Sequence, residues 1–121
     1  MPLDCSCGSS FLLRGHLWVV IAELSGSPDQ VLVVSLTTKR TDSDTTVILQ
    51  SGDHDFIKHD TVVNYTDSRI FNKNDLIDRI DKRDFKPDKP FTADKLKIIQ
   101  QGLLDSAYTP QNMKAFYKKS I

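Results

Sequence analysis

The sequence predicts an α+β fold in which a curled antiparallel sheet is followed by helices, and two observations lead to this prediction. In the first half of the chain, short apolar segments rich in β-branched residues alternate with turn residues. In the second half, apolar residues recur at helical spacing. Strands that precede helices in this way are typical of α+β proteins. Because 121 residues can form one real core but not two, we expect a single domain, with a loose segment at 1–8, a five-stranded barrel at 9–70 and a helical part at 71–121.

Five segments have the composition of strands. The two longest, HLWVVIAEL and QVLVVSLTT, are apolar enough to be buried on both faces, and Trp18 is expected in the core. The stretch SGSPD between them supplies turn residues that join antiparallel neighbours. Five short strands with tight turns predict a small barrel or sandwich. The predicted strands cover residues 9–13, 16–24, 30–38, 45–49 and 61–65.

Three segments have helical character. Asn72, Thr92 and Thr109 are residues that favour the N-cap, and Pro110 suits the first position of a helix. The predicted helices cover residues 72–80, 91–104 and 108–119, and a charged, proline-broken linker at 81–90 separates the first two.

The order of these segments resembles the PemK/MazF family, the toxins of bacterial toxin–antitoxin modules. The likeness is carried by the phrases GHLWVVIAEL, DQVLVVSLTT, DTTVIL and DTVVNYTDSRIFNKNDL. The resemblance implies an SH3-like barrel with added C-terminal helices, usually as a homodimer. It also implies sequence-specific cleavage of single-stranded RNA without a metal or other cofactor, held in check by an antitoxin protein.

The resemblance assigns roles to residues at the ends of strands. His16 stands at the start of the second strand, where the family has its catalytic Arg. Thr37 matches the catalytic Thr or Ser at the end of the third strand, and Thr38 lies beside it.

The fifth-strand polar cluster of the family falls on Asp67, Ser68 and Arg69, and Arg69 is the closest of these to a basic position of the family. The sequence also departs from the family. The Arg-Pro pair of the second strand is absent, and the long basic loop before that strand is reduced to about the dipeptide RG.

RNA cleavage without a metal needs a base for the 2′-hydroxyl, an acid for the leaving 5′-oxygen and a positive group for the phosphorane charge. Histidine suits the first two roles because its unperturbed pKa is near 6.5, and arginine suits the third because it binds phosphate oxygens with two donors. The candidate catalytic residues are His16, Thr37, His54, His59 and Arg69, and the candidate substrate-binding residues are Thr38, Arg40, Asp67 and Ser68.

The stretch SGDHDFIKHD allows three interpretations of His54 and His59. They are acid or base groups at the mouth of the barrel, or polar turn residues that hold the loop by hydrogen bonds. As a third interpretation, they bind a metal together with Asp53, Asp55 and Asp60, although this mixture matches no known ligand spacing. The sequence leaves this choice open.

The distribution of charge favours a second function. The formal net charge is zero, so nothing drives the whole chain towards nucleic acid or a membrane. Residues 41–67 hold six aspartates against Lys58, a composition that repels RNA and suits a basic partner. The alternative function is a non-catalytic module that binds a protein or peptide through the 51–65 loop.

The remaining features concern location. No run of 18 apolar residues is present, so no transmembrane helix is expected, and the first ten residues do not resemble a signal peptide. Cys5 and Cys7 are too close together to staple the fold. A cytoplasmic protein is therefore expected.

Overall fold

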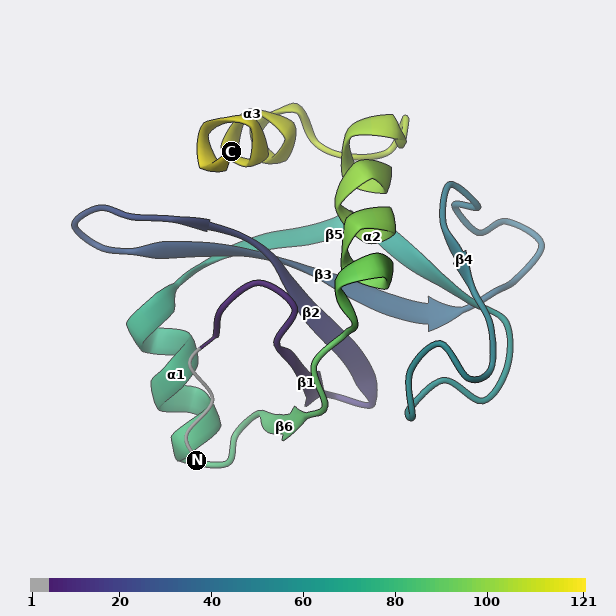
Figure 1. The fold of residues 1–121 in the computed structure, drawn as a ribbon, viewed down its shortest axis with the longest axis horizontal. Helices are drawn as coiled ribbons and strands as arrows, with labels where there is room; N and C mark the ends of the chain where they lie inside the picture. The colour runs from purple at the N-terminus through teal and green to yellow at the C-terminus, as the bar shows by residue number, and fades with distance from the viewer. Residues whose placement is uncertain (1–4) are drawn as a thin grey trace.

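The computed structural model describes residues 5–121, which form an α+β structure built on one antiparallel sheet. The sheet has six strands in the order β4-β5-β3-β2-β1-β6 and curls into half of a barrel (Figure 1). This confirms the predicted α+β class and the curled antiparallel sheet. The strands are β1 Ser10–Leu13, β2 His16–Leu24, β3 Gln30–Thr38, β4 Ile48–Leu49, β5 Thr61–Asn72 and β6 Lys86–Asp88.

β1 and β2 form a hairpin whose two-residue turn is Arg14 and Gly15. Both residues have positive φ, 53° and 81° respectively. Turns with positive φ at both central residues match the right-handed twist of the flanking strands, and glycine adopts this conformation without strain. The turn makes His16 the first residue of β2 and leaves Arg14 exposed at the tip.

β5 extends well beyond residue 65, where the sequence predicted its end. Ser35 of β3 pairs with Asn64, whereas Val33 pairs with Arg69, so residues 65–68 lie opposite a single residue of β3. Extra residues of this kind form a bulge, which bends the strand and increases its twist. Asp67 and Ser68 of the predicted fifth-strand polar cluster therefore lie in the bulge of a continuous strand.

β6 is a sixth strand that the sequence analysis placed in a linker. Lys86–Asp88 pairs antiparallel with β1, and Pro87 is tolerated because an edge strand needs hydrogen bonds on one side only. The predicted boundary between a five-stranded part at 9–70 and a helical part at 71–121 is therefore corrected, because a sixth strand lies within 71–121. β4 is also shorter than the strand predicted at 45–49.

The three helices are α1 Lys73–Asp81, α2 Ala93–Asp105 and α3 Gln111–Ser120. Two of them begin at the predicted caps. The Asn72 side chain accepts hydrogen bonds from the first turn of α1, and Thr92 accepts one from the backbone N–H of Lys95. Within residues 5–121, no helix has the length and apolar character needed to cross a membrane.

α3 starts at Gln111, three residues after the start of the helix predicted at 108–119. Pro110 occupies its N-cap position, and no side chain caps the helix. Thr109, the predicted cap, is buried, and its hydroxyl has no hydrogen-bond partner in the structure. The prediction of Thr109 as the cap was wrong, because the chain turns into the helix only at the proline.

The sheet separates two hydrophobic cores. α2 and α3 cover one face, where Ile99, Leu103 and Phe116 pack against the sheet around Tyr65 (Figure 1). On the other face, α1 packs against a core that includes Trp18, which is 4% exposed. The burial of Trp18 confirms its predicted place in the core.

The N-terminal segment expected to be loose at 1–8 is packed in its described part. Cys5 is buried against the α1 core, while residues 1–4 lie outside the described residues. The Gly8 N–H donates to the Val20 carbonyl at 2.8 Å, and the Gly8 carbonyl accepts from Phe91 at 2.9 Å. These bonds fix the segment against β2 and the chain that follows β6.

Candidate active site

A hollow of about 210 Å³ brings together four of the predicted site residues. His16 comes from the start of β2, Thr37 and Thr38 from the end of β3, and His59 from the loop before β5. These chain ends meet because β3 pairs antiparallel with both β2 and β5. The hollow, called here the central hollow, is lined by His16, Thr37, Thr38, Lys58 and His59, with Leu36, Phe56 and Ile57 as apolar walls.

The ring of His16 is held in one tautomer. Its Nδ1 lies 3.2 Å from the carbonyl oxygen of Leu36. A carbonyl can only accept, so Nδ1 carries the hydrogen in this bond, and in the neutral ring the lone pair resides on Nε2. An exposed imidazole with this arrangement can take up a proton at Nε2, which is what a general base does.

His59 is exposed and lines the same hollow, and its Nε2 lies 2.9 Å from the hydroxyl of Thr38. Its loop is fixed at both sides. The Lys39 N–H donates to the Asp60 carbonyl at 3.1 Å, and the Thr61 hydroxyl donates to the His59 carbonyl at 3.0 Å. The ring is therefore positioned by the end of β3, a strand more than twenty residues earlier in the chain.

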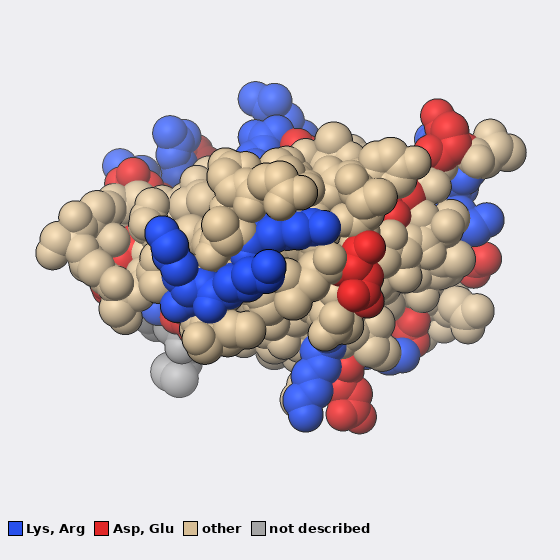
Figure 2. Space-filling model, turned by 90° about the horizontal axis from the view of Figure 1, so that it is seen from above, with Lys and Arg blue, Asp and Glu red and all other residues tan. Residues whose placement is uncertain are grey.

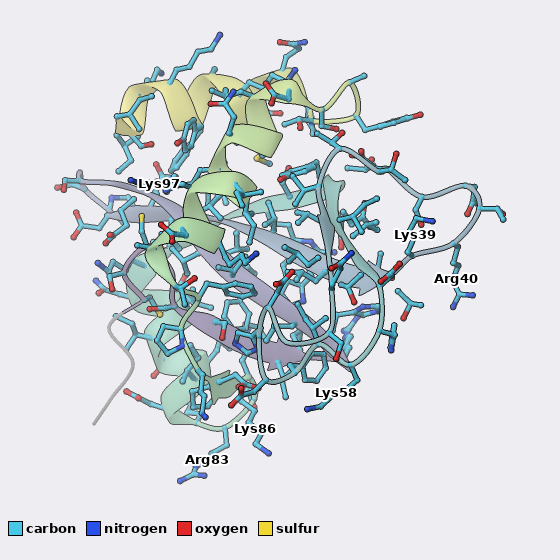
Figure 3. All side chains as sticks on the ribbon, turned by 45° about the vertical axis from the view of Figure 1, so that its right-hand side comes forward. Lys39, Arg40, Lys58, Arg83, Lys86 and Lys97 are labelled. Atoms are coloured by element: carbon cyan, nitrogen blue, oxygen red, sulfur yellow. The ribbon has the colours of Figure 1, made fainter. Side chains whose placement is uncertain are left out.

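The central hollow contains no carboxylate among its walls. Lys58 is exposed, and Figure 3 shows it at the lower edge of the molecule, apart from Lys39 and Arg40. One lysine and two histidines make this hollow suited to an anion. A phosphate placed here would meet donors and proton carriers and no repelling charge.

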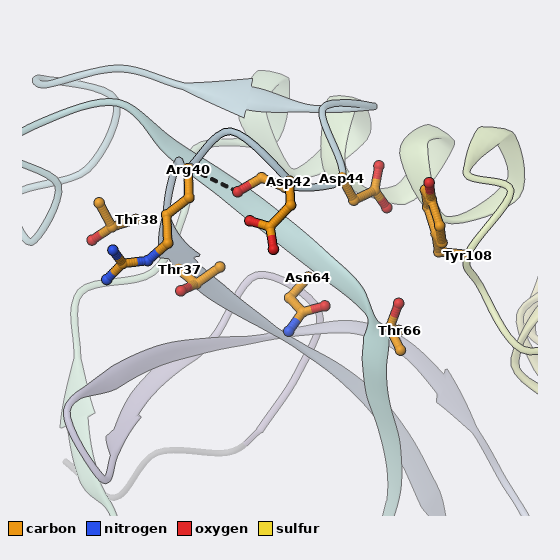
Figure 4. Close-up of a pocket in the computed structure, with 9 residues that line it drawn as sticks. Thr37, Thr38, Arg40, Asp42, Asp44, Asn64, Thr66 and Tyr108 are labelled. Atoms are coloured by element: carbon orange, nitrogen blue, oxygen red, sulfur yellow. Dashed lines mark hydrogen bonds between the residues drawn. The ribbon is translucent and has the colours of Figure 1, made fainter.

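A second hollow, called the acidic hollow, adjoins the central hollow and shares Thr37 and Thr38 with it (Figure 4). Its cation is Arg40, whose backbone N–H donates to Ser43 at 2.7 Å. The remaining walls are Asp42, Asp44, Asn64, Thr66 and Tyr108, so two carboxylates face one arginine.

Asp44 anchors the acidic hollow to the C-terminal end of α2. Its carboxylate accepts hydrogen bonds from the Ser106 hydroxyl and from the Thr46 hydroxyl, both at 2.6 Å. Burial alone would raise the pKa of Asp44, but these bonds and the backbone N–H of Thr46 hold the pKa below its usual value. Asp44 therefore stays ionised and contributes a negative charge to this hollow.

A third hollow, called the arginine hollow, adjoins the central hollow on the other side and shares His16 with it. It contains Arg69, which lies 5.2 Å over the Trp18 ring and is paired with Asp67 at 3.1 Å. Of the predicted residues, Arg69 and Asp67 thus lie near His16, but in this hollow rather than in the central one.

Two predicted residues are turned away from all three hollows. Ser68 is buried in the β5 bulge, where its hydroxyl donates to the Tyr65 carbonyl at 2.9 Å. His54 is 6% exposed, and its ring lies 4.6 Å from the Phe91 ring. Neither side chain is placed to meet a substrate, so the roles that the sequence gave to Ser68 and His54 are not supported by this geometry.

The ring of His54 is occupied on both nitrogens. Nδ1 accepts the N–H of Phe56 at 3.0 Å, so Nε2 carries the hydrogen and donates to the Lys89 carbonyl at 2.7 Å. The hydroxyl of Ser10 donates to the same carbonyl. His54 therefore joins the 51–58 loop to the chain after β6, which corresponds to the structural interpretation of this residue.

Sequence reasoning missed three residues of this region. Lys58 lines the central hollow, and Asn64 and Thr66 line the acidic hollow. Asn64 and Thr66 are two apart on β5, so a period-2 analysis would have placed them on one face. No local signal distinguished Lys58 from the other exposed lysines.

Metal binding finds no support in the part of the chain that the structure describes. Among residues 5–121, no group of three or more His, Cys, Asp or Glu side chains is placed to hold a metal ion. Asp53 is turned towards α2, where it pairs with Lys95 at 3.2 Å, and Asp55 pairs with Lys89. The carboxylates beside His54 therefore form ion pairs that join the loop to neighbouring segments.

Basic residues also gather away from the hollows. Figure 2 shows Lys and Arg side chains over the face seen from above, where α3 lies. α3 contributes Lys114, Lys118 and Lys119, the last two in its final turn, where positive charge complements the helix dipole.

No protein-family model matches the sequence, and no curated protein or solved structure matches the chain. The function is therefore inferred from the site itself.

Proposed function

We propose that this protein is a metal-independent endoribonuclease that cleaves single-stranded RNA in the central hollow. The observation that carries the proposal is that His16 and His59, from β2 and from the loop before β5, line one hollow together with Thr37, Thr38 and Lys58. Two exposed histidines, hydroxyl donors and a cation without a carboxylate match the requirements for transfer of a phosphoryl group from a 5′-oxygen to a neighbouring 2′-oxygen.

The reaction assigns one role to each side chain. Nε2 of His16 takes the proton of the 2′-hydroxyl, and the 2′-oxygen forms a bond to phosphorus. The bond from phosphorus to the 5′-oxygen breaks, and protonated His59 gives its proton to that oxygen. Lys58 and the hydroxyl of Thr37 stabilise the charge on the phosphorane oxygens, and the hydroxyl of Thr38 orients His59. The products are a 2′,3′-cyclic phosphate and a 5′-hydroxyl end.

The proposal includes the PemK/MazF-like assignment. In it, the curled sheet is an SH3-like barrel, the protein acts as a toxin and a homodimer, and an antitoxin protein blocks the site. Two observations support it. His16 and Thr37 share the central hollow, and His16 starts the strand where the family has its arginine. A histidine at that place exchanges a fixed charge for a titrating one, so cleavage should depend on pH more steeply than with arginine.

The test is cleavage of single-stranded RNA by the purified protein in the presence of EDTA, with detection of new 5′-hydroxyl ends. The wild type should cleave, and His16→Ala should lower the rate by about 10²–10⁴-fold, the usual contribution of a general acid or base. Lys97→Ala is the control, because Lys97 is an exposed lysine on α2 outside all three hollows. Equal rates for His16→Ala and the wild type would contradict the proposal.

The non-catalytic binding module remains a second candidate, and one observation favours it. Phe56 is 42% exposed on the loop that carries His59, and it forms an apolar wall of the central hollow. An exposed aromatic residue beside donors suits an extended peptide. Intact RNA after incubation with the wild type would favour this candidate.

A further inference from the structure

The arginine hollow has the size and the side chains of a binding site that catalysis in the central hollow does not use. Its volume is about 460 Å³, within the range of pockets that hold small ligands. Three arginines face it from three different elements: Arg14 from the β1–β2 turn, Arg69 from β5 and Arg79 from α1. Guanidinium groups suit planar, bidentate recognition of phosphate.

The arginines are available for a ligand. Arg69 and Arg79 pair with aspartates at 3.1 and 3.5 Å, but both pairs are more than one-third exposed. Exposed pairs contribute about 0–1 kcal/mol, so they are easily exchanged for a phosphate. Arg14 is exposed and makes no ion pair within the described part of the chain.

The floor of the hollow is aromatic. Phe71 and Phe85 are half-buried there, with ring centroids 6.2 Å apart. The guanidinium carbon of Arg69 lies 5.2 Å from the centre of the ring of Trp18, a third aromatic residue of the hollow. An arginine supported by an aromatic ring offers its outer face to another flat group, and nucleobases stack on guanidinium planes in this way.

The charges of the hollows, and the residue that two of them share, indicate which way an RNA strand runs from the central hollow. The side chains that line the arginine hollow include three arginines against Asp67 and Asp75, and Asp84 pairs with Arg79 beside it, whereas the acidic hollow has Arg40 against two carboxylates. His16 belongs to both the central and the arginine hollow. A polyanion that crosses the central hollow therefore meets more cations on the arginine side and a net negative charge on the acidic side.

We propose that the arginine hollow binds the nucleotide next to the scissile phosphate, with its base on Arg69 and its phosphate at Arg14 and Arg79, so that the RNA strand leaves the central hollow over His16. This inference rests on the proposed function for the identity of the ligand. An acidic peptide is the less favoured occupant. The two aspartates in the hollow repel its carboxylates as they repel phosphate, so charge does not separate the two ligands. A peptide, however, has fewer flat groups that could stack on the aromatic floor.

The test uses binding without cleavage. Trp18 is the single tryptophan of the chain and belongs to the hollow, so its fluorescence reports on an occupant. A single-stranded oligodeoxynucleotide, which lacks the 2′-hydroxyl and cannot be cleaved by this reaction, should change the emission. Arg14→Gln and Arg79→Gln should each weaken its binding and reduce the slope of log affinity against log salt by about 0.7, the value for one phosphate contact in single strands.

Control variants make the test specific. Lys97→Gln removes a positive charge on α2 and should leave the affinity unchanged. Arg40→Gln removes the cation of the acidic hollow and should weaken binding less than Arg14→Gln does. An equal or greater loss with Arg40→Gln would overturn the proposed course of the strand.

Other ligands separate the remaining outcomes. A response to adenosine monophosphate but not to the oligonucleotide would overturn the assignment to an RNA strand in favour of a free nucleotide. A response to a polyglutamate peptide alone would overturn it in favour of a protein partner. Oligonucleotide binding with the expected arginine dependence, but without cleavage of RNA, would support the binding site in the arginine hollow and contradict the proposed endoribonuclease activity.

Discussion

The hydroxyl of Thr38 lies 2.9 Å from Nε2 of His59, although the two residues are 21 positions apart in the chain. This contact fixes the orientation of an exposed imidazole that would otherwise rotate freely. In the proposed reaction it directs His59 towards the central hollow, so Thr38 acts as a positioning residue for the acid.

The first prediction concerns this contact. Thr38→Val keeps the shape of the side chain and removes the hydroxyl, so the rate of RNA cleavage should fall about tenfold, less than the 10²–10⁴-fold loss expected for His59→Ala. Thr38→Ser should restore most of the rate, since it restores the hydroxyl. The measurement is kcat and KM with one RNA oligonucleotide. An unchanged rate in Thr38→Val would show that this contact does not contribute to catalysis.

The second prediction separates the two histidines of the 51–60 loop. His54→Ala removes the hydrogen bonds to Phe56 and Lys89, and should lower the free energy of unfolding by about 1–3 kcal/mol, since each bond contributes about 0.5–1.5 kcal/mol. His59→Ala should change stability little, because its ring is exposed. Urea denaturation measures both. A larger loss of stability in His59→Ala than in His54→Ala would contradict the structural role of His54.

The third prediction concerns acid. The pKa of Asp44 is lowered in the folded protein, so the stability it contributes is present above its unfolded pKa, near 4, and is lost as pH falls through the lower folded value. Asp44→Asn should therefore reduce stability at pH 7 by about 1.5–3 kcal/mol, the usual contribution of a hydrogen bond to a charged group. At about pH 2 the difference from the wild type should shrink. Thermal unfolding at both pH values gives the answer, and Asp42→Asn, an exposed neighbour, serves as the control.

The fourth prediction concerns the packing of α2 on the sheet. A Cβ at Gly102 would lie 2.2 Å from the hydroxyl of Tyr65 and 2.4 Å from Cγ2 of Val47. The Tyr65 hydroxyl donates to the Ile99 carbonyl at 2.7 Å, so it cannot move without losing that bond. Gly102→Ala should destabilise the protein by about 1–3 kcal/mol despite the better helix propensity of alanine.

The control for this substitution is Gly26→Ala, where the added Cβ meets only the Pro28 carbonyl at 3.4 Å. Its free energy of unfolding should stay near that of the wild type. A Gly102→Ala variant as stable as the wild type would show that Tyr65 and Val47 move apart more easily than their burial indicates.

The fifth prediction concerns Cys7, a residue with solvent-accessible surface whose thiol is nevertheless partly shielded from water. Burial of its thiol and the neighbouring Glu23 carboxylate raise the pKa of Cys7 to about 11, so little thiolate forms near neutral pH. Iodoacetamide should modify Cys7 more slowly than a free thiol at pH 8, and Glu23→Gln should speed the reaction. Mass spectrometry of the tryptic peptide that ends at Arg14 locates the label. Labelling of the wild type at the rate of free cysteine would contradict this prediction.

Much of the fold could be predicted from the sequence, because it depends on local patterns. β-Branched residues identified β2 and β3, helical spacing of apolar residues identified the three helices, and Asn72 and Thr92 marked two helix starts. The pattern failed at β6, where a short segment with a proline becomes a strand only because β1 is there to pair with it.

The candidate site was predictable only in part. The sequence nominated His16 and His59, which are 43 residues apart, and it nominated His54 with equal weight. His54 and His59 are five residues apart and each precedes an aspartate, but one is buried against Phe91 and the other is exposed beside Thr38. Burial and hydrogen-bond partners come from segments distant in the chain. The sequence by itself determined β2, β3 and the three helices, and it nominated the side chains to which the proposed chemistry is assigned. The pairing of β2, β3 and β5 decided which of those side chains meet, because strand register sets the neighbours of a residue independently of its place in the chain.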